Sequence, residues 1–112
     1  MNCLVVICNV PDETTATHMA HVLVQEQLAA CVNILPACRS VYRWEGRLEE
    51  AGEIPLLIKT TVQAYPPLQQ RLLELHPYDV PEIIALPVQH GLPAYLTWVS
   101  QSLLSSDGLQ GG

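Results

Sequence analysis

The sequence is poor in positive charge. Lysine and arginine together number 5 among 112 residues, against 11 aspartate and glutamate residues, so the formal net charge is −6 at pH 7. Proteins that bind nucleic acid need clustered cations, because these displace the counterions condensed on the phosphate backbone. The composition therefore argues against a nucleic-acid partner.

The sequence also lacks a long hydrophobic run. The apolar run of residues 4–7 ends at Asn9, which makes it too short to span a membrane. No basic segment precedes this run and no small-residue cleavage site follows it, so it does not resemble an export signal. These absences predict a cytoplasmic protein with no membrane partner.

The four cysteines contain no Cys-x-x-Cys pair. Cys3, Cys8, Cys31 and Cys38 are expected to be free thiols in a reducing compartment rather than a disulfide framework. Free cysteine usually behaves as a small buried hydrophobic residue, which is the simplest interpretation of each position.

Motifs of assembled catalytic sites are missing as well. There is no Gly-x-Ser-x-Gly nucleophile elbow, and no glycine-rich phosphate loop follows the first apolar run. We therefore do not expect an enzyme.

Apolar side chains, in contrast, are abundant. Apolar residues make up 49% of the chain and charged residues only 14%, whereas typical soluble domains are about 25% charged. The length suits one domain, placed here at residues 1–104 and followed by a flexible tail at 105–112. A subunit this small cannot bury so much apolar surface alone, so we expect a symmetric homo-oligomer.

Hydrophobic periodicity predicts alternating strands and helices. The expected strands are residues 2–10, 31–44, 48–62 and 82–88. The expected helices are residues 13–29, a second helix marked by Tyr65, Leu68, Leu72 and Leu75, and residues 92–104. Pro66 and Pro67 open the second helix in its first turn, and Pro77 closes it. Pro36 must interrupt the second strand as a bulge or bend. The order is that of a ferredoxin-like α+β fold, βαββαβ with an extra C-terminal helix and the helices on one face of an antiparallel sheet.

The second and third strands form a long hairpin around a turn at residues 45–47. Each arm is about twice the usual strand length of five to six residues. The hairpin should project beyond its own sheet and contact a partner.

Three groups of side chains could bind a ligand. His18 and His21 are three residues apart on the first helix, opposite its apolar stripe, and we interpret them as polar surface. The segment 76–82 combines His76, Tyr78 and two carboxylates; it is either a functional loop or a helix cap that covers the core. Cys8 beside an imidazole would favour copper or zinc, although two ligands do not complete a site.

A further group could meet at a subunit boundary. It combines Lys59, inside an apolar strand, with Glu82, His90, Tyr95 and Trp98. The alternative for Lys59 is an interfacial salt bridge that specifies register more than it stabilises.

Several short motifs in order resemble the CutA divalent-cation tolerance family up to Leu104. They are Tyr42-Arg43-Trp44-Glu45-Gly46, Lys59-Thr60-Thr61, His76-Pro77-Tyr78, Val80-Pro81-Glu82, Leu86-Pro87-Val88, His90-Gly91, Tyr95-Leu96 and Trp98. The resemblance implies a homotrimer in which the long hairpin reaches to neighbours. It also implies a role in divalent-cation tolerance, with copper or another divalent cation bound without high affinity.

The resemblance also implies two sites. The family's proposed copper ligands match Cys8 and His76 here, while Leu75 replaces a third ligand. The family's intersubunit cleft matches Trp44, Lys59, Tyr78, Glu82, His90, Tyr95 and Trp98. The alternative function is a small-molecule sensor or signalling module that uses this cleft, as the architecturally similar PII-like trimers do.

Overall fold

The structure is a computed structural model, and it describes residues 2–104. The tail predicted at 105–112 lies outside the described residues. The strands are β1 (Cys3–Val10), β2 (Cys31–Ile34), β3 (Cys38–Trp44), β4 (Arg47–Thr61) and β5 (Ile83–Pro87). The helices are α1 (Glu13–Gln25), α2 (Tyr65–Leu75) and α3 (Pro93–Gln101).

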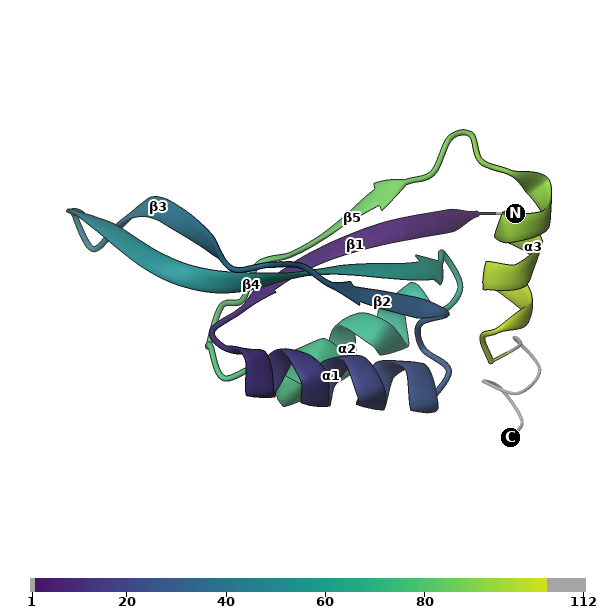
Figure 1. Ribbon diagram of the computed structural model, residues 1–112, viewed down its shortest axis with the longest axis horizontal. Helices are drawn as coiled ribbons and strands as arrows, with labels where there is room; N and C mark the ends of the chain where they lie inside the picture. Colours follow the sequence, from purple (N-terminus) through teal and green to yellow (C-terminus); the bar gives the residue numbers. More distant parts are fainter. Residues whose placement is uncertain (1, 105–112) are drawn as a thin grey trace.

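The strands form one antiparallel sheet in the order β2-β4-β1-β5, and β3 pairs with the outer half of β4. The long strands β1 and β4 occupy its centre, and β2 and β5 form its edges. Helices α1 and α2 cover one face of this sheet, as Figure 1 shows. The predicted ferredoxin-like α+β fold is confirmed.

The core lies between this face and the two helices. Alternate residues of β1 and β4 point into it, because successive side chains of a strand point to opposite faces. The apolar stripe of α1 packs against them, as its periodicity predicts. The largest fully buried side chains of this core are Met19, Leu23, Leu56, Ile58, Leu68, Leu72, Val6 and Val10.

Asp12 begins α1 as its N-cap. The backbone N–H of Thr15 donates to Asp12 Oδ1 at 2.8 Å, and this hydrogen bond holds the pKa of the Asp12 carboxyl below its usual value. A carboxylate at this position satisfies a backbone donor that has no partner inside the helix.

Two helices end earlier than the periodicity predicts. Helix α1 ends at Gln25 rather than at residue 29, because Gln27 takes a left-handed conformation (φ 60°). That reversal places the buried Leu28 on the core and lets its N–H donate to Leu23 O at 3.0 Å. Helix α3 ends at Gln101 rather than at residue 104, and the N–H of Leu104 instead donates to Gln27 O at 3.2 Å.

The long hairpin is formed by β3 and the outer half of β4. Glu45 and Gly46 connect the arms and both have positive φ (50° and 77°), the combination of a type I′ turn that matches the twist of the strands. Residues 35–37 face only Ile54 and Pro55 between the registers of β2 and β3, so the expected interruption at Pro36 is a bulge. The hairpin projects beyond the helices at one end of the molecule (Figure 1).

Within the described part of the chain, the second face of the sheet is covered only at the opposite end. There α3 packs Val99 and Leu103 against Cys3 and Ala30. Among residues 2–104, no helix lies over the rest of this face (Figure 1). We call this uncovered area the open face; strand alternation assigns to it Val5, Ile7, Asn9, Cys31, Asn33, Pro55, Leu57, Lys59, Ile84 and Leu86.

Candidate functional site

The middle of the open face is apolar and accessible to solvent. Ile84 and Leu86 of the edge strand β5 are 49% and 50% exposed, and Leu57, on the other side of Ile7 in the same row, is half-buried. Such a contiguous apolar area on a small protein marks a contact surface more often than a solvated one. Polar side chains gather at its two ends.

The first polar group lies where the sheet meets the hairpin, and we call it the carboxylate end. The side-chain amide of Asn9 donates to Glu53 Oε1 at 3.5 Å and to Glu82 Oε1 at 3.4 Å. Ser40 Oγ donates to Glu53 Oε1 at 2.6 Å, and the Tyr78 hydroxyl donates to Glu53 Oε2 at 3.4 Å. Two carboxylates from different elements therefore converge on one amide.

The charge at the carboxylate end affects its neighbours. Partial burial, reinforced by the Glu53 carboxylate, raises the pKa of the Tyr78 phenol. That phenol therefore stays protonated at neutral pH and acts as a hydrogen-bond donor to Glu53.

The second polar group lies near α3, and we call it the lysine end. The Lys59 ammonium donates to Asn33 Oδ1 across the β2–β4 pair, where Lys59 faces Cys31. Tyr95 and Trp98 of α3 stack with ring centroids 5.5 Å apart. Burial raises the pKa of the Tyr95 phenol. The Cys3 thiol donates to Leu96 O at 3.8 Å, a contact that joins α3 to this end of the sheet.

Within one chain, the residues predicted for the cleft do not form a single site. Tyr78 and Glu82 lie at the carboxylate end, and Lys59 lies at the other end of the open face with the two aromatic rings of α3. Trp44 is at the tip of the hairpin, about 20 Å along the strand from Glu53, given a rise of about 3.4 Å per residue. His90 is exposed in the loop between β5 and α3.

Cys8, one of the two predicted metal ligands, belongs to the core. Its side chain is fully buried on the helix-covered face of β1, opposite Leu56. Burial raises the pKa of the Cys8 thiol to about 12, and the nearby carboxylates of Glu82 and Glu53 add to the rise. The thiolate that a metal requires is therefore strongly disfavoured at neutral pH.

His76, the other predicted ligand, holds the chain at the end of α2. Its side chain is 7% exposed, and both ring nitrogens are hydrogen-bonded. Nδ1 accepts from the backbone N–H of Tyr78 at 3.1 Å, so Nε2 carries the proton and donates to Asn9 O at 2.8 Å. This geometry agrees with the cap interpretation of the loop: His76 closes it onto β1.

A metal does not fit this pair as the side chains stand. Among residues 2–104, no three His, Cys, Asp or Glu side chains are grouped to hold an ion. Binding at Cys8 and His76 would require removal of the thiol proton and of at least one of the two histidine hydrogen bonds. The assignment of these ligands stays a prediction.

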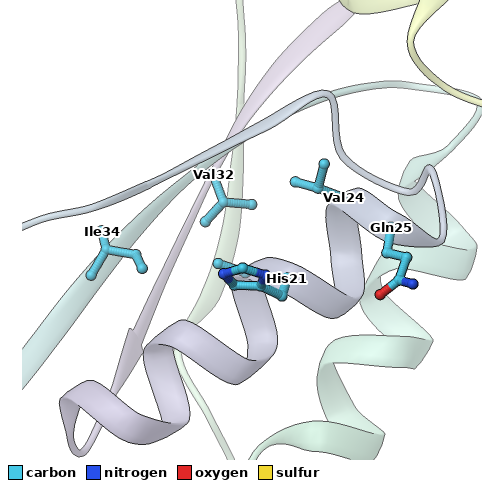
Figure 2. Close-up of a pocket in the computed structure, with 6 residues that line it drawn as sticks. His21, Val24, Gln25, Val32 and Ile34 are labelled. Atoms are coloured by element: carbon cyan, nitrogen blue, oxygen red, sulfur yellow. The ribbon is translucent and has the colours of Figure 1, made fainter.

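His18 and His21 are exposed on α1, away from its buried stripe, as the periodicity predicts. His21 borders an open hollow between α1 and the edge strand β2, where it lies near Val24, Val32 and Ile34 (Figure 2). The other side chains of this hollow are aliphatic or amide groups, so it offers a ligand a single titratable group.

Sequence reasoning missed four side chains of these two polar groups: Asn9, Asn33, Ser40 and Glu53. A signal for Glu53 was present in the sequence. It is six residues from Lys59 on one strand, and an even spacing places both on the same face. Asn9 and Ser40 carried no comparable signal, because their contacts join elements that are distant in the sequence.

Comparison with known proteins identifies the relatives of the chain. The model of the CutA1 divalent ion tolerance protein family matches residues 4–102. The divalent-cation tolerance protein CutA of Thermus thermophilus is 50% identical over 98 residues, which cover 88% of this chain and 95% of that protein. These names describe tolerance to divalent cations and no catalysed reaction.

Solved structures agree with this comparison. CutA1 from Oryza sativa has a TM-score of 0.92 at 40% identity and covers 95% of this chain and 97% of its own. A protein from Archaeoglobus fulgidus described as the periplasmic divalent cation tolerance protein CutA has a TM-score of 0.86 at 30% identity, with 89% and 97% covered.

Within residues 2–104, no helix has both the length and the apolar character needed to cross a bilayer. The longest is α1, with 13 residues, whereas a spanning helix needs about 20.

Proposed function

This chain belongs to the CutA1 divalent ion tolerance protein family, and on that premise we propose that it acts in tolerance to divalent cations as a homotrimer. The observation that carries the functional proposal is the family match over almost the whole described chain. The cytoplasm is the proposed location.

The open face and the hairpin support the homotrimer. The open face leaves Leu57, Ile84 and Leu86 in contact with water, and burying such a side chain fully stabilises a protein by about 1.5–3 kcal/mol. The hairpin carries exposed Trp44 and Leu48 beyond the reach of its own core. Three copies around an axis would cover both surfaces by one repeated contact.

We further propose that copper or another divalent cation binds weakly, with Cys8 and His76 as the ligands. Both lie at the end of β1, since His76 is hydrogen-bonded to Asn9, the residue after Cys8. We expect weak affinity, because binding must overcome the raised pKa of the Cys8 thiol and break a histidine hydrogen bond. Metal ligands must be deprotonated, so binding releases a proton.

Growth measurements test the proposed role. A bacterial host that lacks its own member of this family is grown over a range of Cu(II) or Zn(II) concentrations, with and without expression of the chain. Expression is expected to raise the metal concentration that halves the growth rate. Equal inhibitory concentrations for every metal, with the protein present at normal abundance, would contradict the role.

Calorimetric titration tests the proposed ligands. Cu(II), Cu(I) and Zn(II) are titrated into the wild type and into Cys8→Ala and His76→Ala variants. We expect weak wild-type binding that strengthens by about tenfold per pH unit from pH 7 to pH 8, because one thiol proton is released well below its pKa. Neither variant should show the heat of metal binding that the wild type gives.

The matched control is His21→Ala, which removes an exposed imidazole from α1. Its isotherm should equal that of the wild type. Identical isotherms for all four proteins would show that Cys8 and His76 are not metal ligands. The proposed role in tolerance would then still depend on the growth test.

A further inference from the structure

The loop between α2 and β5, residues 77–82, is held to the rest of the protein by side chains. Within residues 2–104, no backbone-to-backbone hydrogen bond outside the helices and strands involves this loop. Residues 77–80 are exposed, and Val80 at the middle of the loop is 81% exposed. Segments with little burial and few backbone hydrogen bonds open at a low cost in free energy. A few side-chain contacts therefore decide whether this loop is ordered.

The strongest of these contacts come from His76, the buried residue just before the loop. Its Nδ1 accepts from the backbone N–H of Tyr78 at 3.1 Å, and its Nε2 donates to Asn9 O at 2.8 Å. We call these two hydrogen bonds the His76 latch. A neutral imidazole has one N–H, so both bonds exist together only while the proton is on Nε2.

The latch positions two side chains of the carboxylate end. The Tyr78 hydroxyl donates to Glu53 Oε2, and the Asn9 amide donates to Glu82 Oε1, both at 3.4 Å. Hydrogen bonds of this length are beyond the usual range and weak. They cannot hold the loop by themselves, so the places of Tyr78 and Glu82 depend on the latch.

Ligation of a metal by His76 is incompatible with the latch at either ring nitrogen. If Nδ1 is the ligand, its lone pair no longer accepts from the Tyr78 N–H. If Nε2 is the ligand, Asn9 O loses its donor and the single proton of the neutral ring moves to Nδ1. A ring N–H then faces the Tyr78 N–H, two donors with no acceptor between them. Both modes break the hydrogen bond to Tyr78.

We propose that the closed latch and a metal-bound His76 exclude each other, so that metal binding releases loop 77–82. This inference rests on the proposed metal role of His76 and adds a conformational response to it. Release of the Tyr78 N–H frees the loop, and Tyr78 and Glu82 leave their fixed places beside Glu53 and Asn9. The metal-free and metal-bound chains then present different surfaces at the carboxylate end.

Hydrogen exchange of the Tyr78 amide tests this coupling. The chain has four tyrosines, so labelling tyrosine alone with nitrogen-15 gives four backbone amide signals in NMR spectra. A Tyr78→Phe sample identifies the signal of Tyr78. Zn(II) is the probe, because its filled d shell makes it redox-inert and leaves the signals undisturbed.

Saturating Zn(II) is expected to speed exchange of the Tyr78 amide by about tenfold, the effect of one lost hydrogen bond. A chelator should restore the original rate. The amides of Tyr42, Tyr65 and Tyr95 lie in β3, α2 and α3, and their exchange should not change. Faster exchange at all four tyrosines would indicate general destabilisation and overturn the proposal.

Two substitutions of His76 separate the latch from a general effect on stability. His76→Phe keeps a buried ring without nitrogen, so the Tyr78 amide should exchange fast without metal and not respond to Zn(II). His76→Asn places a carboxamide oxygen near the position of Nδ1, where it can accept from the Tyr78 N–H. Slow exchange should return, again without a response to Zn(II). Equal rates in the two variants would overturn the latch.

The matched control is His21→Ala, which should respond to Zn(II) like the wild type, and circular dichroism establishes that each variant is folded. Heat of Zn(II) binding in calorimetry without any change at Tyr78 would overturn the coupling and leave His76 as a ligand. No heat and no change at Tyr78 would overturn the proposed ligands, and the coupling with them. The two failures are therefore distinguishable.

Discussion

Replacing Ile84 with aspartate is expected to convert the proposed homotrimer into single chains. Ile84 lies in the apolar middle of the open face and is 49% exposed in one subunit, so the isolated fold should tolerate the change. In the trimer, the new carboxylate would be buried against apolar neighbours. An unpaired buried charge costs several kcal/mol, and the apolar contact of about 1.5–3 kcal/mol is lost as well. The cost is repeated at each subunit.

Sedimentation velocity measures the outcome directly, as a change from the mass of three 12.4 kDa chains to that of one. The matched control is Leu73→Asp on α2, where the leucine is 45% exposed and lies on the other side of the molecule. The control should remain trimeric. If Ile84→Asp also sediments as a trimer, the open face is not the subunit contact.

Replacing Leu56 with alanine is expected to cause a large loss of subunit stability. Leu56 is fully buried on the helix-covered face of β4, opposite Cys8, and it packs in the core beneath α1 and α2. Leucine-to-alanine changes at such positions cost about 2–5 kcal/mol, because the contacts are lost and a cavity remains. That is a large share of the 5–15 kcal/mol that usually stabilises a domain.

Leu57 provides the comparison, because it follows Leu56 directly and points to the opposite face. Urea unfolding of both variants is measured in the Ile84→Asp background, so that association does not contribute to the free energy of unfolding. Leu57→Ala should cost less than half as much as Leu56→Ala there. In the otherwise wild-type protein it should mainly speed subunit exchange. Equal losses in the monomeric background would contradict the assignment of the two faces.

The prediction of the fold succeeded where a short sequence pattern has one physical meaning. The alternation of side chains along residues 54–59, which the sequence alone shows, separates the buried Ile54, Leu56 and Ile58 from Leu57 and Lys59, since a strand has only two faces. The proline positions marked the interruption of the hairpin and both ends of α2, because proline lacks the backbone N–H that a regular ladder needs.

The helix ends were predicted less well. The apolar stripe of α1 continues to Leu28, so periodicity alone extends the helix to residue 29. The chain turns at Gln27 instead, because Leu28 reaches the core from a non-helical position and Ala30 donates its N–H to Lys59 O on β4 at 2.8 Å. That bond depends on a strand about 30 residues away in the sequence, which no local pattern contains.

The candidate sites were also predicted only in part from the sequence. Sequence pattern and resemblance selected Lys59, Tyr78 and Glu82, and the structure places all three at the ends of the open face. The structure also shows two features that no sequence pattern could predict. Asn9 is hydrogen-bonded to both Glu53 and Glu82, and both ring nitrogens of His76 form hydrogen bonds. The trimer and the bound metal remain predictions for the experiments above, and the sensor alternative stays a prediction.

The sequence by itself determined the order of strands and helices, the face to which each strand residue points, and the family. These properties depend on spacing along the chain, which the 2-residue and 3.6-residue periods of strands and helices convert into faces. Only the tertiary structure decided which charges are paired, which ring nitrogen carries a proton and how strongly a thiol resists ionisation. Those properties depend on distances through space between distant segments and on the water excluded when they pack.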